Sequence, residues 1–239
     1  MDQYCADVAS VFEARLDSRL IGVYLHGSAV LGGFDPRRSD IDILVVCADP
    51  LSASTRSAVI HELGEQRLPC PARGLELSVV TRTAARNPTA SPAYELHMTT
   101  HPADTKAGPD PTGHGDPDLV LHFAVCHQSG RLFGTGGVAA EVFAPVPGEL
   151  VRGQLVAELR WAAEHAPAEY TVLNACRAWK YTVDGTLVSK VDGGGWAMEL
   201  VPEKELIRAA LRRQFGLPAA ELDPEAVRGF ADSMISRMA

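Results

Sequence analysis

The sequence predicts an α+β fold, in which an N-terminal domain made of a mixed β-sheet with flanking helices precedes an all-α helical bundle. Short apolar and β-branched runs, typical of buried strands, lie within the first 80 residues, and from Glu149 onward apolar residues recur at helical spacing. Strands followed by a run of helices indicate an α+β part and a separate all-α part. The linker-like stretch APVPGEL, residues 144–150, predicts domains at 1–147 and 148–239.

Each element is predicted from a local pattern. Apolar residues three and four positions apart, from Val8 to Leu20, predict an opening amphipathic helix. The other elements expected in the N-terminal domain are strands at 20–25, 41–46 and 75–80, helices at 52–68 and 118–130, and a short helical piece at 94–99 within a loop-rich segment at 87–117. The C-terminal domain is expected to contain helices at 150–165, 170–183, 196–200, 203–215 and 224–238.

The composition predicts a globular protein without nucleic-acid or membrane partners. The 239 residues are 46% hydrophobic, and the formal net charge of -8 argues against a general affinity for nucleic-acid phosphates. Five cysteines lack CxxC pairing, which indicates reduced thiols rather than disulfides or a zinc site. The start, MDQYCADVASVFEARL, lacks the basic region of a signal peptide, and no apolar run approaches the roughly 18 residues of a membrane span. We expect a cytoplasmic protein, with a monomer favoured.

Two aspartates stand at the entry of the strand predicted at 41–46. In LHGSAVLGGFDPRRSDIDILVV, residues 25–46, Asp40 and Asp42 share one parity, so they project to one face while Ile41 and Ile43 project to the other. Two neighbouring carboxylates need a cation to remain ionised away from water. Carboxylate oxygens suit Mg2+, which usually binds through one or two carboxylates together with substrate phosphates.

Two further features complete a candidate nucleotide site. The turn at Gly27 and Ser28 follows a predicted strand, and small residues let backbone N–H groups approach a phosphate closely. In LELSVV, residues 75–80, Glu76 faces away from the apolar side of the strand. If this strand lies beside the strand at 41–46, Glu76 joins the aspartates as a further metal ligand or as the base for an attacking hydroxyl.

The complete string of Gly-Ser, spacer, Ser-Asp-x-Asp and apolar strand resembles the nucleotidyltransferase signature of the DNA polymerase beta-like superfamily. An isolated Asp-x-Asp is usually a solvated loop or a helix N-cap, so the whole string carries the resemblance. The resemblance implies that Asp40 and Asp42 hold Mg2+ together with ATP, the co-substrate. Gly27, Ser28 and Ser39 would then surround the phosphates, and attack on the α-phosphorus would expel pyrophosphate.

The C-terminal half resembles the helical domain of aminoglycoside adenylyltransferases of the streptomycin/spectinomycin type. The resemblance rests on Arg-x-Trp at 177–179, the pattern from Gly185 to Lys190, Trp-x-x-Glu at 196–199, and the bridging segments at 116–136 and 142–147. It implies that Glu76 is the general base for a drug hydroxyl, that Lys190 contacts the triphosphate and that Asp118 supports the nucleotide. Each residue also has a structural reading: Lys190 as a solvated lysine, Asp118 as a helix N-cap.

The segments that would recognise the acceptor differ from the family pattern. Where the family commonly has a tryptophan that packs on the drug, this chain has His101. The segment between Trp161 and Tyr170 is shorter than in the family, and the acids left for a cationic aminoglycoside are Glu164 and Glu169. The resemblance therefore implies acceptor contacts at His101, Trp161, Glu164 and Glu169, while a solvated helix face is the alternative for the two acids.

Three functions are compatible with the sequence. The first is transfer of AMP from ATP to a hydroxyl of streptomycin or spectinomycin. The second keeps this chemistry but uses another acceptor, such as another antibiotic, a biosynthetic intermediate or a protein hydroxyl. The third is a nucleotide-binding regulatory or antitoxin-like protein with little turnover. The complete set of Asp40, Asp42 and Glu76 favours an enzyme.

Overall fold

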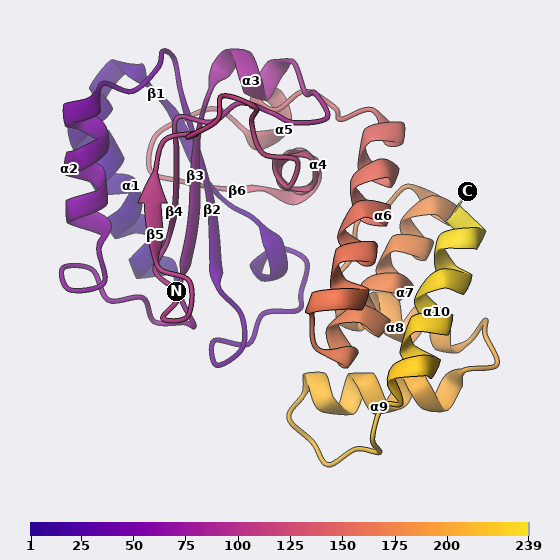
Figure 1. The fold of residues 1–239 in the computed structure, drawn as a ribbon. Coiled ribbons are helices and arrows are strands. Elements are labelled where there is room, and N and C mark those ends of the chain that lie inside the picture. The colour runs from indigo at the N-terminus through magenta and orange to yellow at the C-terminus, as the bar shows by residue number, and fades with distance from the viewer. Residues whose placement is uncertain (239) are drawn as a thin grey trace. The chain divides into compact units, whose positions relative to one another are not determined.

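The computed structural model describes residues 1–238 and divides into two compact units, Met1–Pro147 and a second unit that begins at Gly148. The N-terminal unit is built on a six-stranded sheet with the strand order β5-β4-β3-β2-β1-β6 (Figure 1). Its strands are β1 (Leu20–Leu25), β2 (Ile41–Cys47), β3 (Leu75–Thr81), β4 (Leu96–Thr99), β5 (Lys106–Gly108) and β6 (Arg131–Phe133). The central pair, β2 and β3, is parallel and the other pairs are antiparallel, so the expected mixed sheet is confirmed.

Helices cover both faces of this sheet (Figure 1). One layer contains α1 (Asp2–Leu16) and α2 (Ala53–Leu63), and the other contains α3 (Arg82–Arg86), α4 (Leu119–Ser129) and α5 (Ala139–Val142). Because side chains alternate along a strand, Ile43 of β2 lies in the core with Phe12 of α1, while Leu44 lies in the core with Phe123 of α4. Burial of each of these side chains contributes roughly 1.5–3 kcal/mol.

Three parts of the N-terminal unit differ from the sequence prediction. The segment expected as a short helix at 94–99 contains strand β4, which pairs with β3 through Glu76 and Thr99. Strands β5 and β6 and helices α3 and α5 were not predicted, because each spans five residues or fewer. The helix expected at 52–68 ends at Leu63. Pairing with distant strands, rather than local sequence, decides the state of such short segments.

The second unit is an all-α bundle, as predicted. Its helices are α6 (Gly148–His165), α7 (Ala168–Asp184), α8 (Lys190–Met198), α9 (Lys204–Gln214) and α10 (Pro224–Met238) (Figure 1). Helix α7 packs against the other four helices and supplies Leu173 and Cys176 to the core, where they meet Phe230 and Met234 of α10. Helix α7 is terminated by the next residue, Gly185, whose φ of 73° is the left-handed conformation that glycine adopts without strain.

Helix α8 begins at Lys190, six residues before the predicted start at Trp196, and therefore includes three consecutive glycines. A Cβ atom at Gly193 would lie 2.7 Å from the Cα atom of Arg177, and one at Gly194 would lie 2.7 Å from Cδ2 of Leu173. Both positions therefore let α8 approach α7 closely. A Cβ atom at Gly195 would meet nothing within 4 Å.

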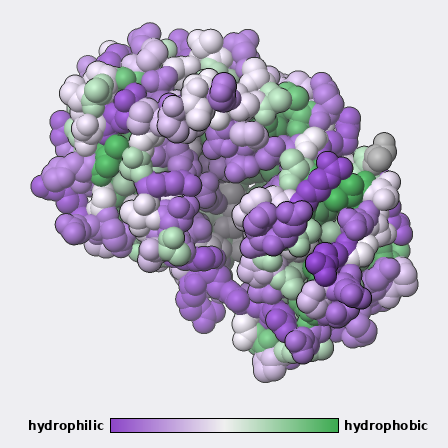
Figure 2. Space-filling model, viewed as in Figure 1, coloured by the Kyte–Doolittle hydropathy of each residue, from purple (hydrophilic) through white to green (hydrophobic). Residues whose placement is uncertain are grey.

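The surface visible in Figure 2 is covered mainly by hydrophilic residues, with hydrophobic residues in small patches. Among the described residues, the large exposed hydrophobic side chains include Trp161 and Phe215, each 55% exposed. In the described part of the chain, no helix has the length and apolar character needed to cross a bilayer. All five cysteines are free thiols.

Candidate functional site

The Gly27–Ser28 turn lies directly against the carboxylate of Asp42. Strand β1 ends at Leu25, and a single 3-10 turn, η2 (Gly27–Ala29), follows it. The backbone N–H of His26 donates a hydrogen bond of 3.0 Å to the carbonyl oxygen of Asp42. Gly27 has a φ of 62°, and a Cβ atom there would lie 1.8 Å from Oδ2 of Asp42. Only glycine fits this position, for both backbone and steric reasons.

Asp42 and Glu76 are direct neighbours across the central strand pair. The parallel register of β2 and β3 places Asp42 opposite Glu76, and Leu44 opposite Ser78. The adjacency that the sequence analysis assumed for these strands is therefore present, and both carboxylates project to the face covered by α4. Asp40 precedes the first residue of β2 and is half-buried, as is Asp42, while the side chain of Glu76 is 37% exposed.

Ser39 and His101 lie on backbone segments that border the same end of the strands. The backbone N–H and hydroxyl of Ser39 both bond to Asp35, which closes the turn before Asp40. Arg73 donates its backbone N–H to the Ser39 carbonyl and its Nε to Nε2 of His101 over 2.6 Å. His101 follows β4, which pairs with β3 at Glu76. The structure thus brings Ser39, Asp40 and His101 to the end of the central strands where Asp42 lies.

Two histidines that the sequence analysis did not assign to the site stand beside the acids. The ring of His26 lies 4.7 Å from the ring of His122 on α4, measured between centroids. Nε2 of His122 lies 3.9 Å from Oε1 of Glu76. Strand parity offered a signal for His26, because it shares the parity of Tyr24 and so faces α4. For His122 the sequence offers no such signal, because this residue reaches the acids only through the packing of α4.

Burial sets the protonation of the groups beneath the acids. Burial, with a smaller contribution from His122, lowers the pKa of His26 well below its usual value, so the His26 ring is neutral. Burial also raises the pKa of the Cys126 thiol, and the charge of Asp42 adds to this effect. The pKa of His97 is lowered by burial, although the charge of Glu76 opposes the shift. The side chains that lie beneath the acids are therefore uncharged and largely shielded from water.

The arrangement fits an ion that completes its coordination shell with substrate oxygens. Among residues 1–238, no group of three or more His, Cys, Asp or Glu side chains encloses a metal position by itself. Mg2+ does not need such a cage, because it is usually held by one or two carboxylates, phosphate oxygens and water. Asp42 and its strand neighbour Glu76 supply oxygen donors, and the missing side chain of Gly27 lets the turn pack against the Asp42 carboxylate without a clash.

Asp118 occupies the N-cap position of α4, which was its structural reading. Its side chain makes no capping hydrogen bond, and its backbone N–H donates to Oδ1 of Asp116 over 2.9 Å. Asp118 is exposed and lies one helical turn before His122. The structure therefore places Asp118 at the start of the helix that covers the acids.

In the second unit, Lys190 is the first residue of α8 and belongs to a polar cluster. Its Nζ atom lies 4.1 Å from the centroid of the Tyr170 ring. The Tyr170 hydroxyl donates to Oε1 of Glu158 over 2.7 Å, and Nη2 of Arg177 donates to the same carboxylate over 3.1 and 3.3 Å. Arg177 thus pairs with an internal acid, Glu158, which the sequence analysis did not single out.

The remaining candidates for acceptor contacts lie on α6 and α7. Trp161 of α6 stacks on His165, with ring centroids 5.6 Å apart and ring planes at 14°. Glu164 is exposed on the same helix, and Glu169 is half-buried in the first turn of α7. The structure gives Trp161 a flat aromatic surface in contact with solvent, whereas the two acids retain the reading of a solvated helix face.

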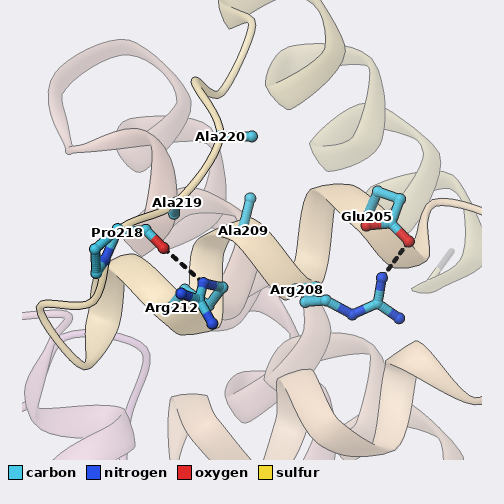
Figure 3. A pocket seen from close by; sticks show the side chains of 7 residues that line it. All are labelled: Glu205, Arg208, Ala209, Arg212, Pro218, Ala219 and Ala220. Atoms are coloured by element: carbon cyan, nitrogen blue, oxygen red, sulfur yellow. Dashed lines mark hydrogen bonds and ion pairs between the residues drawn. The ribbon is translucent and has the colours of Figure 1, made fainter.

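A surface pocket of about 400 Å³ lies elsewhere in the second unit, along α9 (Figure 3). Its two arginines are already engaged: Arg208 pairs with Glu205, and Arg212 donates to the carbonyl of Pro218 over 2.6 Å. The hydrogen bond from Arg212 fastens the loop after α9 to the helix. None of the residues that line this pocket belongs to the acid cluster or to the Lys190 cluster.

Comparison with known families matches both units. A nucleotidyltransferase domain model matches residues 9–90, and a model for the C-terminal domain of aminoglycoside adenylyltransferases matches residues 141–237. The chain is also similar to a solved structure of a spectinomycin adenyltransferase from Enterococcus faecialis with ATP and spectinomycin. That similarity has a TM-score of 0.73 at 18% identity, covers 99% of this chain and 98% of the other, and establishes a shared fold.

Curated relatives extend the agreement to sequence. An aminoglycoside (3'') (9) adenylyltransferase from Klebsiella pneumoniae is 30% identical over 218 residues, which cover 82% of this chain and 78% of the relative. A spectinomycin 9-adenylyltransferase from Staphylococcus aureus is 26% identical over 205 residues, with the same two coverages. The nucleotidyltransferase fold, the paired acids on adjacent strands and this similarity along most of the chain agree. The chain belongs to the aminoglycoside adenylyltransferase family.

Proposed function

We propose that this protein transfers AMP from ATP to a hydroxyl group of an aminoglycoside-type antibiotic, streptomycin or spectinomycin, and releases pyrophosphate. The observation that supports the proposal most strongly is the position of Asp42, which is opposite Glu76 and beneath the Gly27 turn. This arrangement combines two carboxylates with a glycine turn at which backbone can approach a phosphate closely. The names of the relatives point to the same reaction.

Asp40, Asp42 and Glu76 would hold Mg2+ in this reaction. The bound ion would neutralise charge on the triphosphate and polarise the α-phosphoryl group. Gly27, Ser28 and Ser39 would position the phosphates, with Lys190 and Asp118 as further nucleotide contacts.

The reaction then needs a base and a positioned hydroxyl. Glu76 would accept the hydroxyl proton on a carboxylate oxygen as the acceptor oxygen bonds to the α-phosphorus. The bond between the α-phosphorus and the bridging oxygen breaks, and pyrophosphate leaves with that electron pair. His122, 3.9 Å from Oε1 of Glu76, borders the place where the proton arrives.

The acceptor would be a small cationic molecule. Trp161 offers an exposed aromatic face, while Glu164 and Glu169 offer negative charge in the second unit. His101 lies near the end of the central strands that carry the acids, where it accepts a hydrogen bond from Arg73. Cations bind favourably to aromatic faces and carboxylates. These four residues are therefore the proposed acceptor contacts.

Pyrophosphate release from Mg-ATP, with and without streptomycin or spectinomycin, tests the proposal. Release should depend on one of the drugs and fall at least about a hundredfold in Asp40→Asn and Asp42→Asn, because loss of a metal ligand removes several kcal/mol of transition-state stabilisation. Asp49→Asn is the matched control, since Asp49 is exposed beyond the end of β2. Drug-dependent release that survives Asp42→Asn would refute the mechanism.

Two further results separate the parts of the proposal. Glu76→Gln should lower turnover about a hundredfold or more, the usual contribution of a general base, while Mg-ATP still binds. Full turnover in Glu76→Gln would remove only the assignment of the base. Mg-ATP binding without release in the presence of either drug would keep the nucleotide site and exclude both drugs as acceptors.

A further inference from the structure

The polar cluster of the second unit connects Lys190 to three residues that the proposed reaction does not use. Glu158 lies on α6, Tyr170 and Arg177 lie on α7, and Lys190 begins α8. Only 15% of the Glu158 side chain and 22% of the Arg177 side chain are exposed. The cluster therefore joins three helices through groups that are largely withdrawn from water.

Glu158 is the centre of this cluster. Its carboxylate accepts hydrogen bonds from the Tyr170 hydroxyl and from Nη2 of Arg177. Burial acts to raise the pKa of Glu158, but Arg177, hydrogen bonds from Asn174 and Tyr170, and the charge of Lys190 outweigh it, so the pKa lies below its usual value. The carboxylate is consequently ionised at neutral pH, and two cations face it.

A buried ion pair of this kind adds little net stability, because the desolvation of both partners offsets their attraction. The Nε atom of Arg177 is moreover buried and has no hydrogen-bond partner among the described residues. A buried donor left in this way is unfavourable, because its lost hydration is not replaced. The retention of such a cluster is explained more readily by the geometry that it imposes than by stability.

The geometry that it imposes concerns Lys190. The Tyr170 hydroxyl is held by Glu158, which fixes where the far end of the ring lies, and the Lys190 ammonium lies over that ring at 4.1 Å from its centroid. The start of α8 is fixed as well, because the Ser189 hydroxyl accepts from the backbone N–H of Asp192 and donates to its Oδ2. An aromatic face attracts an ammonium group without acting as an acceptor for each of its N–H groups, as a carboxylate would.

We infer that Tyr170, fixed by Glu158, is a positioning residue that orients the Lys190 ammonium for the polyphosphate of the nucleotide. This inference rests on the proposed function, in which Lys190 binds the nucleotide. It assigns Tyr170 no contact with the reacting atoms. Its effect passes through Lys190, so changes at the two residues must be coupled.

The test measures the dissociation constant of Mg-ATP for the full-length protein, by displacement of a fluorescent ATP analogue. Tyr170→Leu removes the ring and should weaken binding about fivefold to tenfold, within the range of a cation–π interaction. Tyr170→Phe keeps the ring but removes its hydrogen bond to Glu158, so it should weaken binding by a smaller factor, about twofold to threefold. Tyr181→Phe, on the same helix and also half-buried, is the matched control and should bind as the wild type does.

The decisive comparison is a double-mutant cycle. Lys190→Ala should weaken Mg-ATP binding, and Tyr170→Leu should then have no further effect in that background. Glu158→Met has a similar length and removes the acceptor of the Tyr170 hydroxyl, so it should weaken binding in the wild type and not in the Lys190→Ala background. This second cycle replaces the first if Tyr170→Leu does not fold. Urea unfolding of each variant identifies any variant that is simply unfolded.

Three outcomes would overturn the inference: unchanged binding in Tyr170→Leu, unchanged binding in Lys190→Ala, or an equal effect of Tyr170→Leu with and without Lys190. Because the assay measures binding in the absence of an acceptor, it remains informative if neither antibiotic supports turnover. Failure of the proposed function would instead appear as drug-dependent release that is insensitive to Asp42→Asn.

Discussion

The glycine run of α8 allows the packing of two helices to be tested one position at a time. Gly193, Gly194 and Gly195 all lie inside α8, so replacement by Ala should gain about 1 kcal/mol of helix propensity at each position. The three positions differ in what the added Cβ atom would meet. At Gly195 it meets nothing within 4 Å, and the free energy of unfolding should rise by about 0.5–1 kcal/mol.

The other two positions should show progressively larger losses. At Gly194 the Cβ atom would lie 2.7 Å from the end of the Leu173 side chain, which can move at about 0.5–1.5 kcal/mol, so the net change should be near zero. At Gly193 it would lie 2.7 Å from Cα of Arg177 and 2.8 Å from its backbone nitrogen. Backbone atoms of a buried helix cannot move alone, so overpacking of about 1–3 kcal/mol should exceed the propensity gain.

Urea unfolding followed by tryptophan fluorescence is the appropriate assay. All three tryptophans of the chain, Trp161, Trp179 and Trp196, lie in the second unit, so their emission reports that unit alone. Trp179 of α7 and Trp196 of α8 have ring centroids 4.7 Å apart, so near-UV circular dichroism also reports the α7–α8 contact. The stability order should be Gly195→Ala above wild type, then Gly194→Ala, then Gly193→Ala. Equal stability of Gly193→Ala and Gly195→Ala would refute the close-packing argument.

Two further predictions concern the acid site and the Glu158 cluster. Gly27→Ala should lower turnover at least about a hundredfold, because the added Cβ atom displaces Asp42. Gly32→Ala is the control: Gly32 has a φ of 83° but open space around it, so this variant should lose only roughly 1–2 kcal/mol of stability. Equal turnover of the two variants would contradict this prediction. Glu158→Gln should lose about 3 kcal/mol of unfolding free energy by leaving Arg177 without its charged partner. Because the pKa of Glu158 in the folded protein lies below its usual 4.5, the stability lost in Glu158→Gln should be complete above pH 4.5 and should shrink as the pH falls through the folded pKa. If urea unfolding shows the same stability difference between the two proteins at every pH, the ionised state of Glu158 is refuted.

The central strands and the position of the acids could be predicted because both follow from local patterns. The runs at 41–46 and 75–80 are rich in apolar residues, and parity alone indicated that Asp42 and Glu76 face away from the apolar side of their strands. The adjacency of the two strands was an assumption from chain order, and the parallel register supplied it. Strand β4 could not be predicted, since its state depends on pairing with β3.

The polar partners of the site were harder to predict than its acids. His26 and His122 meet only because β1 and α4 pack together, and they lie 96 positions apart in the sequence. Glu158 looks like any acid on an amphipathic helix, and its role depends on α7 placing Arg177 and Tyr170 around it. The early start of α8 was missed because three glycines argue against a helix unless a neighbouring helix requires them.

Because Asp42 and Glu76 lie on the parallel strands β2 and β3, the acid site is as stable as the centre of the sheet. The relative positions of Asp42 and Glu76 along the strands are set by backbone hydrogen bonds between two central strands, which are flanked by β1 on one side and β4 on the other. Such amides exchange with solvent mainly when the whole unit opens. Loops around the site can therefore change in sequence without loosening the acids, and on heating the acids should separate only as the N-terminal unit unfolds.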